Sequence, residues 1–232
     1  MASCLARGLP RCTEKPVRTG RLAVVAAGPS VRDYLEEIRG WDGEVWAING
    51  AYDYLRANGI VPHGFMAIDP LPGLAEYVKN PHPDTTFYLS SVLDPSVFDA
   101  LEGYNIKVWF ADQDAVTFPS GVYVVGGGTT AITRAPFLAR MLGWRDITFF
   151  GADSSFDDGE SRYCYGYRKY GEDSKANVLK VNLPTGEGPF YTELCLMKQV
   201  AQMGTIAMYL QGTKIDFRCK GLMDAYIRSP VL

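Results

Sequence analysis

Short apolar segments recur along this chain, and most are followed by a stretch with a helical pattern. The segments are Leu22–Ala27, Glu44–Ile48, Gly64–Ile68, Thr85–Leu89, Lys107–Phe110, Val122–Val125 and Asp146–Phe150. Runs such as LAVVAA and ITFF lack the polar alternation of a strand with one face in water, which indicates strands buried on both faces. Strands that alternate with helices are typical of an α/β fold, so the sequence predicts a mostly parallel sheet with helices on both faces.

The length of the chain allows a full core within one domain. It has 232 residues, of which 47% are hydrophobic, and single α/β domains often reach this size. We expect residues 21–232 to form this domain, and the basic segment 1–20 to form a flexible or surface-docked arm. Residues 154–190, rich in tyrosine and glycine, are predicted to form a long excursion before a helix near Thr192–Leu210.

Charge and cysteine content argue against several classes of protein. The formal net charge is −3 without a long run of lysine and arginine, so there is no electrostatic signal for general nucleic-acid binding or for an anionic membrane surface. No apolar stretch approaches the roughly 20 residues of a transmembrane helix. The five cysteines lack CxxC spacing, and only His63 and His82 accompany them, so we expect the reduced thiols of a cytoplasmic protein rather than a zinc cluster.

Two glycine-containing turns lie beyond the carboxyl ends of predicted strands, where an open parallel sheet binds its ligands. In the first, Gly28-Pro29-Ser30, glycine permits close backbone approach and Ser30 can cap the next helix. The second is Gly126-Gly127-Gly128-Thr129-Thr130, between a strand and a helix. Neither turn fits a P-loop or the GxGxxG pattern, so each is either an anion-binding helix start or only a tight turn.

Polar residues also follow three further strands. They are Asn49-Gly50, Asp69-Pro70 and Gly151-Ala152-Asp153. An amide or carboxylate held at a strand end can bind ribose, phosphate or a hydrated metal ion. Each motif also has an ordinary interpretation as a turn or a helix cap, but the recurrence at successive strand ends favours a nucleotide site at this edge of the sheet.

The stretch SRYCYGYRKYGED within the excursion has two interpretations. If it is extended, Tyr163, Tyr165 and Tyr167 lie on one face, with Arg162 and Arg168 on the other face or at the edges. Tyrosine hydroxyls and an arginine placed over a cleft would hold the phosphate of a departing nucleotide. The alternative is an aromatic hairpin that only covers the core.

The order of these motifs resembles the MptE-like family, formerly a domain of unknown function, which includes the motility-associated factors. The pattern consists of GPS at 28–30, NG at 49–50, DP at 69–70, GGGTT at 126–130, LG at 142–143, ITFFGAD at 147–153 and VNLPTGEGPFYT at 181–192. It spans roughly residues 21–221, and only the ordered set is specific because each motif is short. The chain is more distantly similar to bacterial sialyltransferases that use CMP-sialic acid.

The resemblance implies a Rossmann-like nucleotide-binding domain. Family members are diphosphokinases that act on a hydroxymethyl pterin with ATP and magnesium, or presumed glycosyltransferases that modify flagellin with nonulosonic acid. For this chain we favour a transferase that uses a nucleotide-activated sugar, CMP-nonulosonate being one candidate; the acceptor and the oligomeric state stay open. The nucleotide-binding residues would be Gly28, Pro29, Ser30, Asn49, Gly50, Asp69, Gly126, Gly127, Gly128, Thr129, Thr130 and Gly151.

Three residues would carry the chemistry of this transferase. Asp153 would act as a base or position the acceptor, and Tyr163 or Tyr165 would support the leaving phosphate, with no cofactor required. In a diphosphokinase, by contrast, Asp69 and Asp153 would hold Mg²⁺ on ATP. A third interpretation is a nucleotide-binding module without catalysis.

Several features depart from the pattern of the family. The motility-associated proteins carry large additional domains, for which this sequence has no room. The sialyltransferases use a histidine as general base, whereas no histidine follows His82 here. Pro136 lies inside the helix expected after GGGTT, where it removes a hydrogen bond and is expected to kink or delay the helix.

Overall fold

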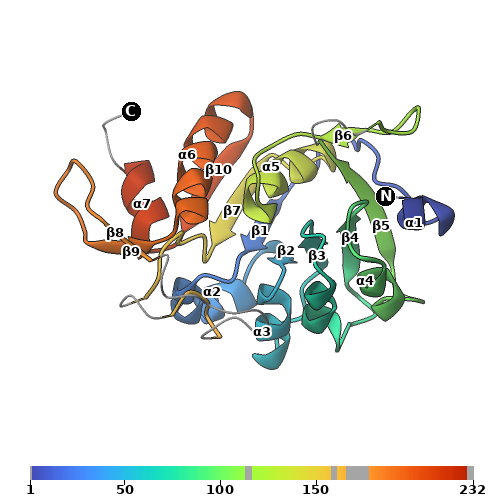
Figure 1. Cartoon of the computed structure of the whole chain (residues 1–232), viewed down its shortest axis with the longest axis horizontal. Coiled ribbons are helices and arrows are strands. Elements are labelled where there is room, and N and C mark those ends of the chain that lie inside the picture. The colour runs from blue at the N-terminus through green and yellow to red at the C-terminus, as the bar shows by residue number, and fades with distance from the viewer. Residues whose placement is uncertain (1, 113–116, 158–160, 166–177, 229–232) are drawn as a thin grey trace.

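An eight-stranded sheet forms the centre of the chain (Figure 1). The structure is a computed structural model that describes residues 2–112, 117–157, 161–165 and 178–228. The strands follow the order β10-β7-β1-β2-β3-β4-β5-β6, and every neighbouring pair is parallel. Their bounds are β1 Arg21–Val25, β2 Gly43–Ile48, β3 Gly64–Ala67, β4 Thr86–Ser90, β5 Ile106–Ala111, β6 Val124–Val125, β7 Asp146–Phe150 and β10 Lys214–Arg218. The predicted Rossmann-like α/β fold is confirmed.

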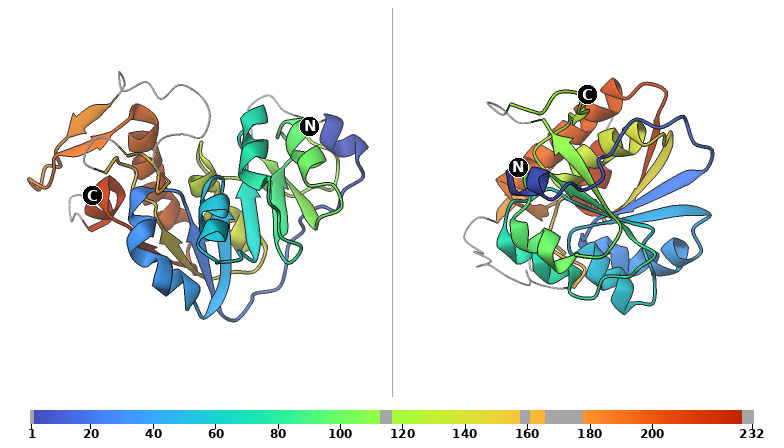
Figure 2. Two further views of the ribbon diagram at one scale, coloured as in Figure 1. Left: turned by 90° about the horizontal axis from the view of Figure 1, so that it is seen from below. Right: turned by 90° about the vertical axis from the view of Figure 1, so that its right-hand side faces the viewer.

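Helices cover both faces of this sheet, as the end-on view in Figure 2 shows. The α-helices are α1 Ala2–Ala6, α2 Leu35–Arg39, α3 Ala51–Ala57, α4 Pro95–Ala100, α5 Ala131–Met141, α6 Leu194–Tyr209 and α7 Gly221–Arg228. Two 3₁₀ helices, η1 Pro29–Tyr34 and η2 Pro72–Val78, follow β1 and β3. A separate antiparallel hairpin pairs β8 Leu179–Val181 with β9 Phe190–Thr192.

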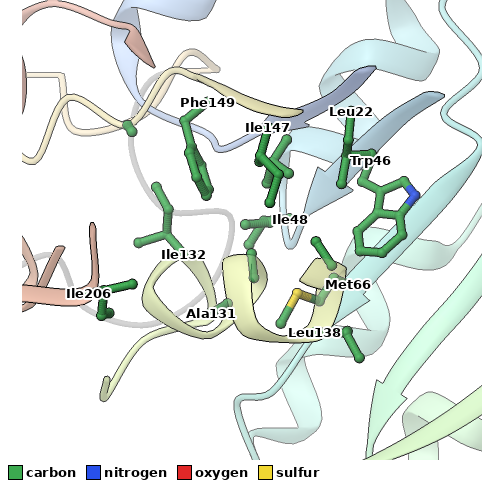
Figure 3. Close-up of a cluster of buried hydrophobic side chains, with 14 of the residues drawn as sticks. Leu22, Trp46, Ile48, Met66, Ala131, Ile132, Leu138, Ile147, Phe149 and Ile206 are labelled. Atoms are coloured by element: carbon green, nitrogen blue, oxygen red, sulfur yellow. The ribbon is translucent and has the colours of Figure 1, made fainter. Parts of the chain in front are cut away.

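The two faces of the sheet bury separate hydrophobic cores because strand residues alternate between them. In β1, Leu22 and Val24 belong to the core under α5 and α6, whereas Ala23 and Val25 belong to the core under α2, α3 and α4. Figure 3 shows the first core, where Ala131 and Leu138 of α5 face the strands. Each β1 side chain from residue 22 to 25 is fully buried, which explains the continuous apolar run in the sequence.

The order of the strands creates a switch point beside β1. The chain proceeds outward from β1 through β6 on one side and then returns to place β7 on the other side. Val25 at the end of β1 pairs with Ala47 of β2 and with Phe150 of β7, so these strands end at the same level. In open parallel sheets the loops diverge at such a point and leave room for a ligand.

Some elements differ from the expectations. The sequence patterns did not identify β10, an edge strand whose residues alternate charged and apolar side chains. Pro136 does not delay α5, which begins at Ala131, although it leaves the carbonyl of Ile132 without its usual helical donor. Ser30 does not cap a helix: the residue before η1 is Gly28, and no side chain caps it.

The N-terminal arm is docked along the outer edge of β5. Arg11 forms a parallel bridge with Val108, and the amide of Cys12 donates a 2.7 Å hydrogen bond to the Val108 carbonyl. β6 pairs only with Phe110 and Ala111, so the arm lies against a part of the strand edge that β6 leaves open.

Candidate functional site

A cavity of about 380 Å³ lies at the switch point, beyond the carboxyl ends of β1, β2, β3 and β7. Its size falls within the range of small-molecule sites. Eight of the residues proposed from the sequence line it, namely Gly28, Asn49, Gly50, Asp69, Thr130, Gly151, Tyr163 and Tyr165. The first turns of α5 and α6 add to the wall, so segments that are far apart in the sequence converge on one space.

Asn49 is held at the end of β2 in the left-handed conformation, with a φ of 48°. Asparagine tolerates this conformation better than most residues. Its Nδ2 atom donates a 2.9 Å hydrogen bond to Oδ2 of Asp69, whereas its buried Oδ1 atom has no partner among the described residues. A buried acceptor without a partner lowers the stability of the folded protein by about 1–3 kcal/mol. This oxygen therefore favours a ligand that donates a hydrogen bond to it.

Arg162 brings a positive charge to the lining of the cavity. Its NH1 group donates a 2.6 Å hydrogen bond to Oε2 of Glu193, and these two side chains are only 11% and 18% exposed. Its guanidinium also lies 5.3 Å from the ring centroid of Tyr163. Within the described chain the buried Nε atom has no hydrogen-bond acceptor, so two residues that line the cavity, Asn49 and Arg162, each have an unpaired buried atom.

The tyrosines form an aromatic stack beside Arg162. The rings of Tyr163 and Tyr165 are parallel, with centroids 5.2 Å apart, and the Tyr165 hydroxyl lies 3.2 Å from that of Tyr77. Burial raises the pKa of Tyr165. A side chain at Gly50 would clash with the Tyr165 ring, so glycine here makes room for a tyrosine. Tyr167 and Arg168 lie outside the described residues.

The turns at 28–30 and 151–153 form one interlocked unit. The amide of Gly28 donates a 2.9 Å hydrogen bond to the Gly151 carbonyl. Asp153 accepts hydrogen bonds from the amide and the hydroxyl of Ser30, at 2.7 and 2.5 Å. Burial raises the pKa of Asp153, and its hydrogen bonds oppose this shift. Pro29, Ser30 and Asp153 line a second cavity of about 390 Å³ instead of the first.

Several hydrogen-bond donors of the turn at Gly126–Thr130 already have acceptors within the protein. Thr130 and Thr133 form a capping box at the start of α5, in which the Thr130 amide donates to the Thr133 hydroxyl at 3.1 Å. Oε1 of Gln202 accepts from both the amide and the hydroxyl of Thr129, at 3.1 and 3.2 Å. Gly127 and Thr129 line a further cavity, whereas neither Gly126 nor Gly128 lines the main one.

The two proposed magnesium ligands line different cavities. Asp69 lines the main cavity and Asp153 lines the second one. The carboxylate of Asp153 already accepts three hydrogen bonds, the third from the Lys220 amide at 2.9 Å. Among the described residues there is no group of three histidine, cysteine or acidic side chains arranged to hold a metal. Magnesium binding by Asp69 and Asp153 with the phosphates of ATP stays a prediction.

Several lining residues had no clear signal in the sequence. Tyr77 comes from η2, and Cys195 and Gln199 come from α6, where they lie four residues apart on one helical face. Gln199 donates a 2.9 Å hydrogen bond to the Ser154 hydroxyl. The sequence signal for Gln199 is weak: it is a polar residue on the inner face of the helix that follows the long excursion.

The thiols of the chain differ in accessibility. All five cysteines are free, and four of them are buried. Cys195 is exposed and lines the main cavity, 3.3 Å from Oε2 of Glu193. In the described part of the chain, no helix is both long and apolar enough to cross a membrane.

Comparisons with known proteins agree with this fold. The solved structure of the MAf glycosyltransferase from Magnetospirillum magneticum AMB-1 matches with a TM-score of 0.67 and 18% identity, over 96% of this chain and 36% of that chain. The present chain thus spans about a third of that protein. No curated protein matches the sequence. The family described as "6-hydroxymethylpterin diphosphokinase MptE-like" matches residues 9–159, more than half of the chain, so this chain belongs to the MptE-like family.

Proposed function

We propose that this chain is a nucleotide-dependent transferase, and that it transfers a sugar from a nucleotide-activated donor. The observation that carries the proposal is the cavity at the switch point, whose lining residues include Asn49 and Arg162. Among the described residues, the buried Oδ1 of Asn49 has no donor and the buried Nε of Arg162 has no acceptor. The family name describes a diphosphokinase, and the similar solved structure is a glycosyltransferase. A diphosphokinase and a glycosyltransferase that uses a nucleotide-sugar both break a bond at a phosphate of the nucleotide.

The polar groups of the cavity suit the two parts of a nucleotide. Asn49 and Asp69 present oxygen atoms that accept hydrogen bonds from ribose hydroxyls. Arg162 has a positive charge and an unpaired donor for a phosphate. Both unpaired atoms are occluded from solvent, so small rotations of these side chains would accompany binding.

The same groups suit the chemistry of transfer. When the bond between the transferred group and the phosphate breaks, negative charge remains on the leaving phosphate. Arg162 would stabilise that charge from the lining of the cavity, and Tyr163 lies against its guanidinium. We assign no general base, because the carboxylate of Asp153 lines the second cavity.

A panel of nucleotides tests the proposal by thermal unfolding. We expect CMP or another sugar-carrier nucleotide to raise the melting temperature without metal, and EDTA to leave the shift unchanged. A ligand at 100 times its Kd stabilises the folded state by about 2.7 kcal/mol. If only ATP with Mg²⁺ raises the melting temperature, the diphosphokinase is the better proposal; if no nucleotide does, both fail.

Variants and a thiol probe locate the bound nucleotide. Asn49→Gly keeps the left-handed backbone and should weaken binding by about tenfold, the loss of one hydrogen bond. Arg162→Lys removes the Nε donor, and Arg140→Lys at the far end of α5 is its control. Bound nucleotide should also slow alkylation of Cys195 by iodoacetamide, since the other cysteines are buried. Binding that leaves Cys195 unprotected would place the nucleotide elsewhere.

A further inference from the structure

We infer that Asp153 is a positioning residue, whose buried carboxylate fixes the Gly28–Ser30 turn, of which Gly28 lines the main cavity, to the start of α7. The three segments that meet at Asp153 are far apart in the sequence. They are the turn after β1, the end of β7 and the residues that join β10 to α7. The consequence for nucleotide binding rests on the proposed function, whereas the structural role does not.

The contacts of the Asp153 carboxylate come from two directions. Oδ2 accepts from the Ser30 amide at 2.7 Å, and Oδ1 accepts from the Ser30 hydroxyl at 2.5 Å and from the Lys220 amide at 2.9 Å. All three partners act as donors. An ionised carboxylate accepts from all of them, whereas an amide in its place would turn an N–H group toward at least one N–H or O–H donor.

The backbone of Asp153 adds a further connection to α7. Its carbonyl accepts a 3.0 Å hydrogen bond from the Met223 amide, and the adjacent Ser155 hydroxyl accepts from the Leu222 amide at 3.2 Å. Asp153 and Ser155 thus satisfy amide groups in the first turn of α7, which have no partner within the helix. The side chain of Asp153 is only 4% exposed, so water does not substitute for these contacts.

Glycine residues leave the space that this carboxylate occupies. A Cβ atom at Gly28 would lie 2.6 Å from Oδ2 of Asp153 and would also overlap the Gly151 carbonyl oxygen. At Gly221, a Cβ atom would lie 3.2 Å from the Asp153 carbonyl oxygen and would overlap the Ser155 hydroxyl. The glycine in the GPS motif is therefore explained by packing against Asp153, and the position of Gly28 in the cavity wall depends on the same contact.

Charged side chains nearby do not replace this role. The ammonium group of Lys220 is 3.0 Å from Oδ2 of Asp33, and both side chains are more than half exposed. Asp33 thus joins η1 to the start of α7 through a surface ion pair, which contributes little to stability. Asp33→Asn is therefore a matched control for Asp153→Asn, because it neutralises a carboxylate between the same two segments.

Hydrogen exchange measured by mass spectrometry tests the structural role in the full chain. Asp153→Asn should speed exchange roughly tenfold in peptides covering residues 26–35 and 216–224 together, with a smaller change elsewhere. Asp33→Asn should leave both peptides near the wild-type rate. Ser30→Ala, which removes one donor, should speed exchange in residues 26–35 and serves as the deciding variant if Asp153→Asn does not fold. Unchanged exchange in both peptides, or an equal rise throughout the chain, would overturn the inference.

Nucleotide affinity then tests the effect on the cavity. At a temperature where each variant is folded, Ser30→Ala and Asp153→Asn should weaken binding of the best nucleotide several-fold, and Asp33→Asn should not. A purely structural role would lower stability and leave the Kd of the folded protein unchanged, which would contradict the positioning of the cavity wall. If the wild-type chain binds no nucleotide, the proposed function fails, while the exchange result still decides the role of Asp153.

Discussion

The two glycine turns of this chain look alike in sequence and differ in structure. The turn at Gly28–Ser30 is packed against β7, and the amide and hydroxyl of Ser30 donate hydrogen bonds to the buried carboxylate of Asp153. The turn at Gly126–Thr130 is partly exposed, and its amides at Thr130 and Thr129 donate hydrogen bonds to the side chains of Thr133 and Gln202. Glycine removes a clash at Gly28 and also at Gly127 and Gly128 of the second turn, whereas Gly126 has no heavy atom within 4 Å of an added Cβ. A glycine before a helix therefore does not show by itself whether the backbone makes room for a ligand or for another part of the protein.

Gly28→Ala should break the first turn and has the largest expected effect. The added Cβ meets a backbone carbonyl and a buried carboxylate, neither of which can move without breaking the contacts between β1 and β7. Overpacking of this kind destabilises a folded protein by about 3 kcal/mol. Urea unfolding followed by circular dichroism measures the change, and a loss below about 1 kcal/mol would show that the interlocked turns are free to adjust.

Thr133→Val should weaken the second turn by a smaller amount. Valine keeps the shape of this fully buried side chain, but the Thr130 amide loses its acceptor and the capping box is lost. We expect a destabilisation of about 1–2 kcal/mol in the same urea experiment.

Thr205→Val is the control for this variant. Thr205 is an exposed threonine of α6 whose hydroxyl donates only to the Ala201 carbonyl, so its replacement should change stability by less than about 0.5 kcal/mol. Equal effects of the two substitutions would mean that the capping box adds nothing to the turn.

Local patterns in the sequence predicted seven of the eight strands of the main sheet and the sheet edge at which the cavity lies. Buried strands such as β1 and β7 are continuous apolar runs, and parallel strands bring their carboxyl ends to one edge. That geometry alone places Asn49, Asp69 and Gly151 at the same cavity. The edge strand β10 escaped recognition because its partly exposed residues mix charged and apolar side chains.

The direction of each side chain was not predictable from these patterns. Neighbouring residues at 152–155 alternate between two cavities, with Ala152 and Ser154 on the main one and Asp153 and Ser155 on the second. A one-residue difference in register therefore decides whether a carboxylate reaches the ligand or holds the scaffold. Contacts such as Ser30 with Asp153 join residues separated by more than one hundred positions, and no local pattern reports them.

Gly126→Ala should have the smallest effect and separates the two uses of glycine within the second turn. No atom lies near the added Cβ, and Gly126 is not among the glycines with positive φ, so alanine fits its backbone. We expect the free energy of unfolding to stay within about 0.5 kcal/mol of the wild type, or to rise slightly because alanine restricts the unfolded chain.

Nucleotide titrations on the same protein sharpen the comparison. If Gly126→Ala weakens binding at unchanged stability, the open space above this turn admits the ligand, and the second turn is an anion-binding site. If stability and binding both match the wild type, the turn is a corner that leads the chain into α5, and the ligand is held at the switch point between β1 and β7.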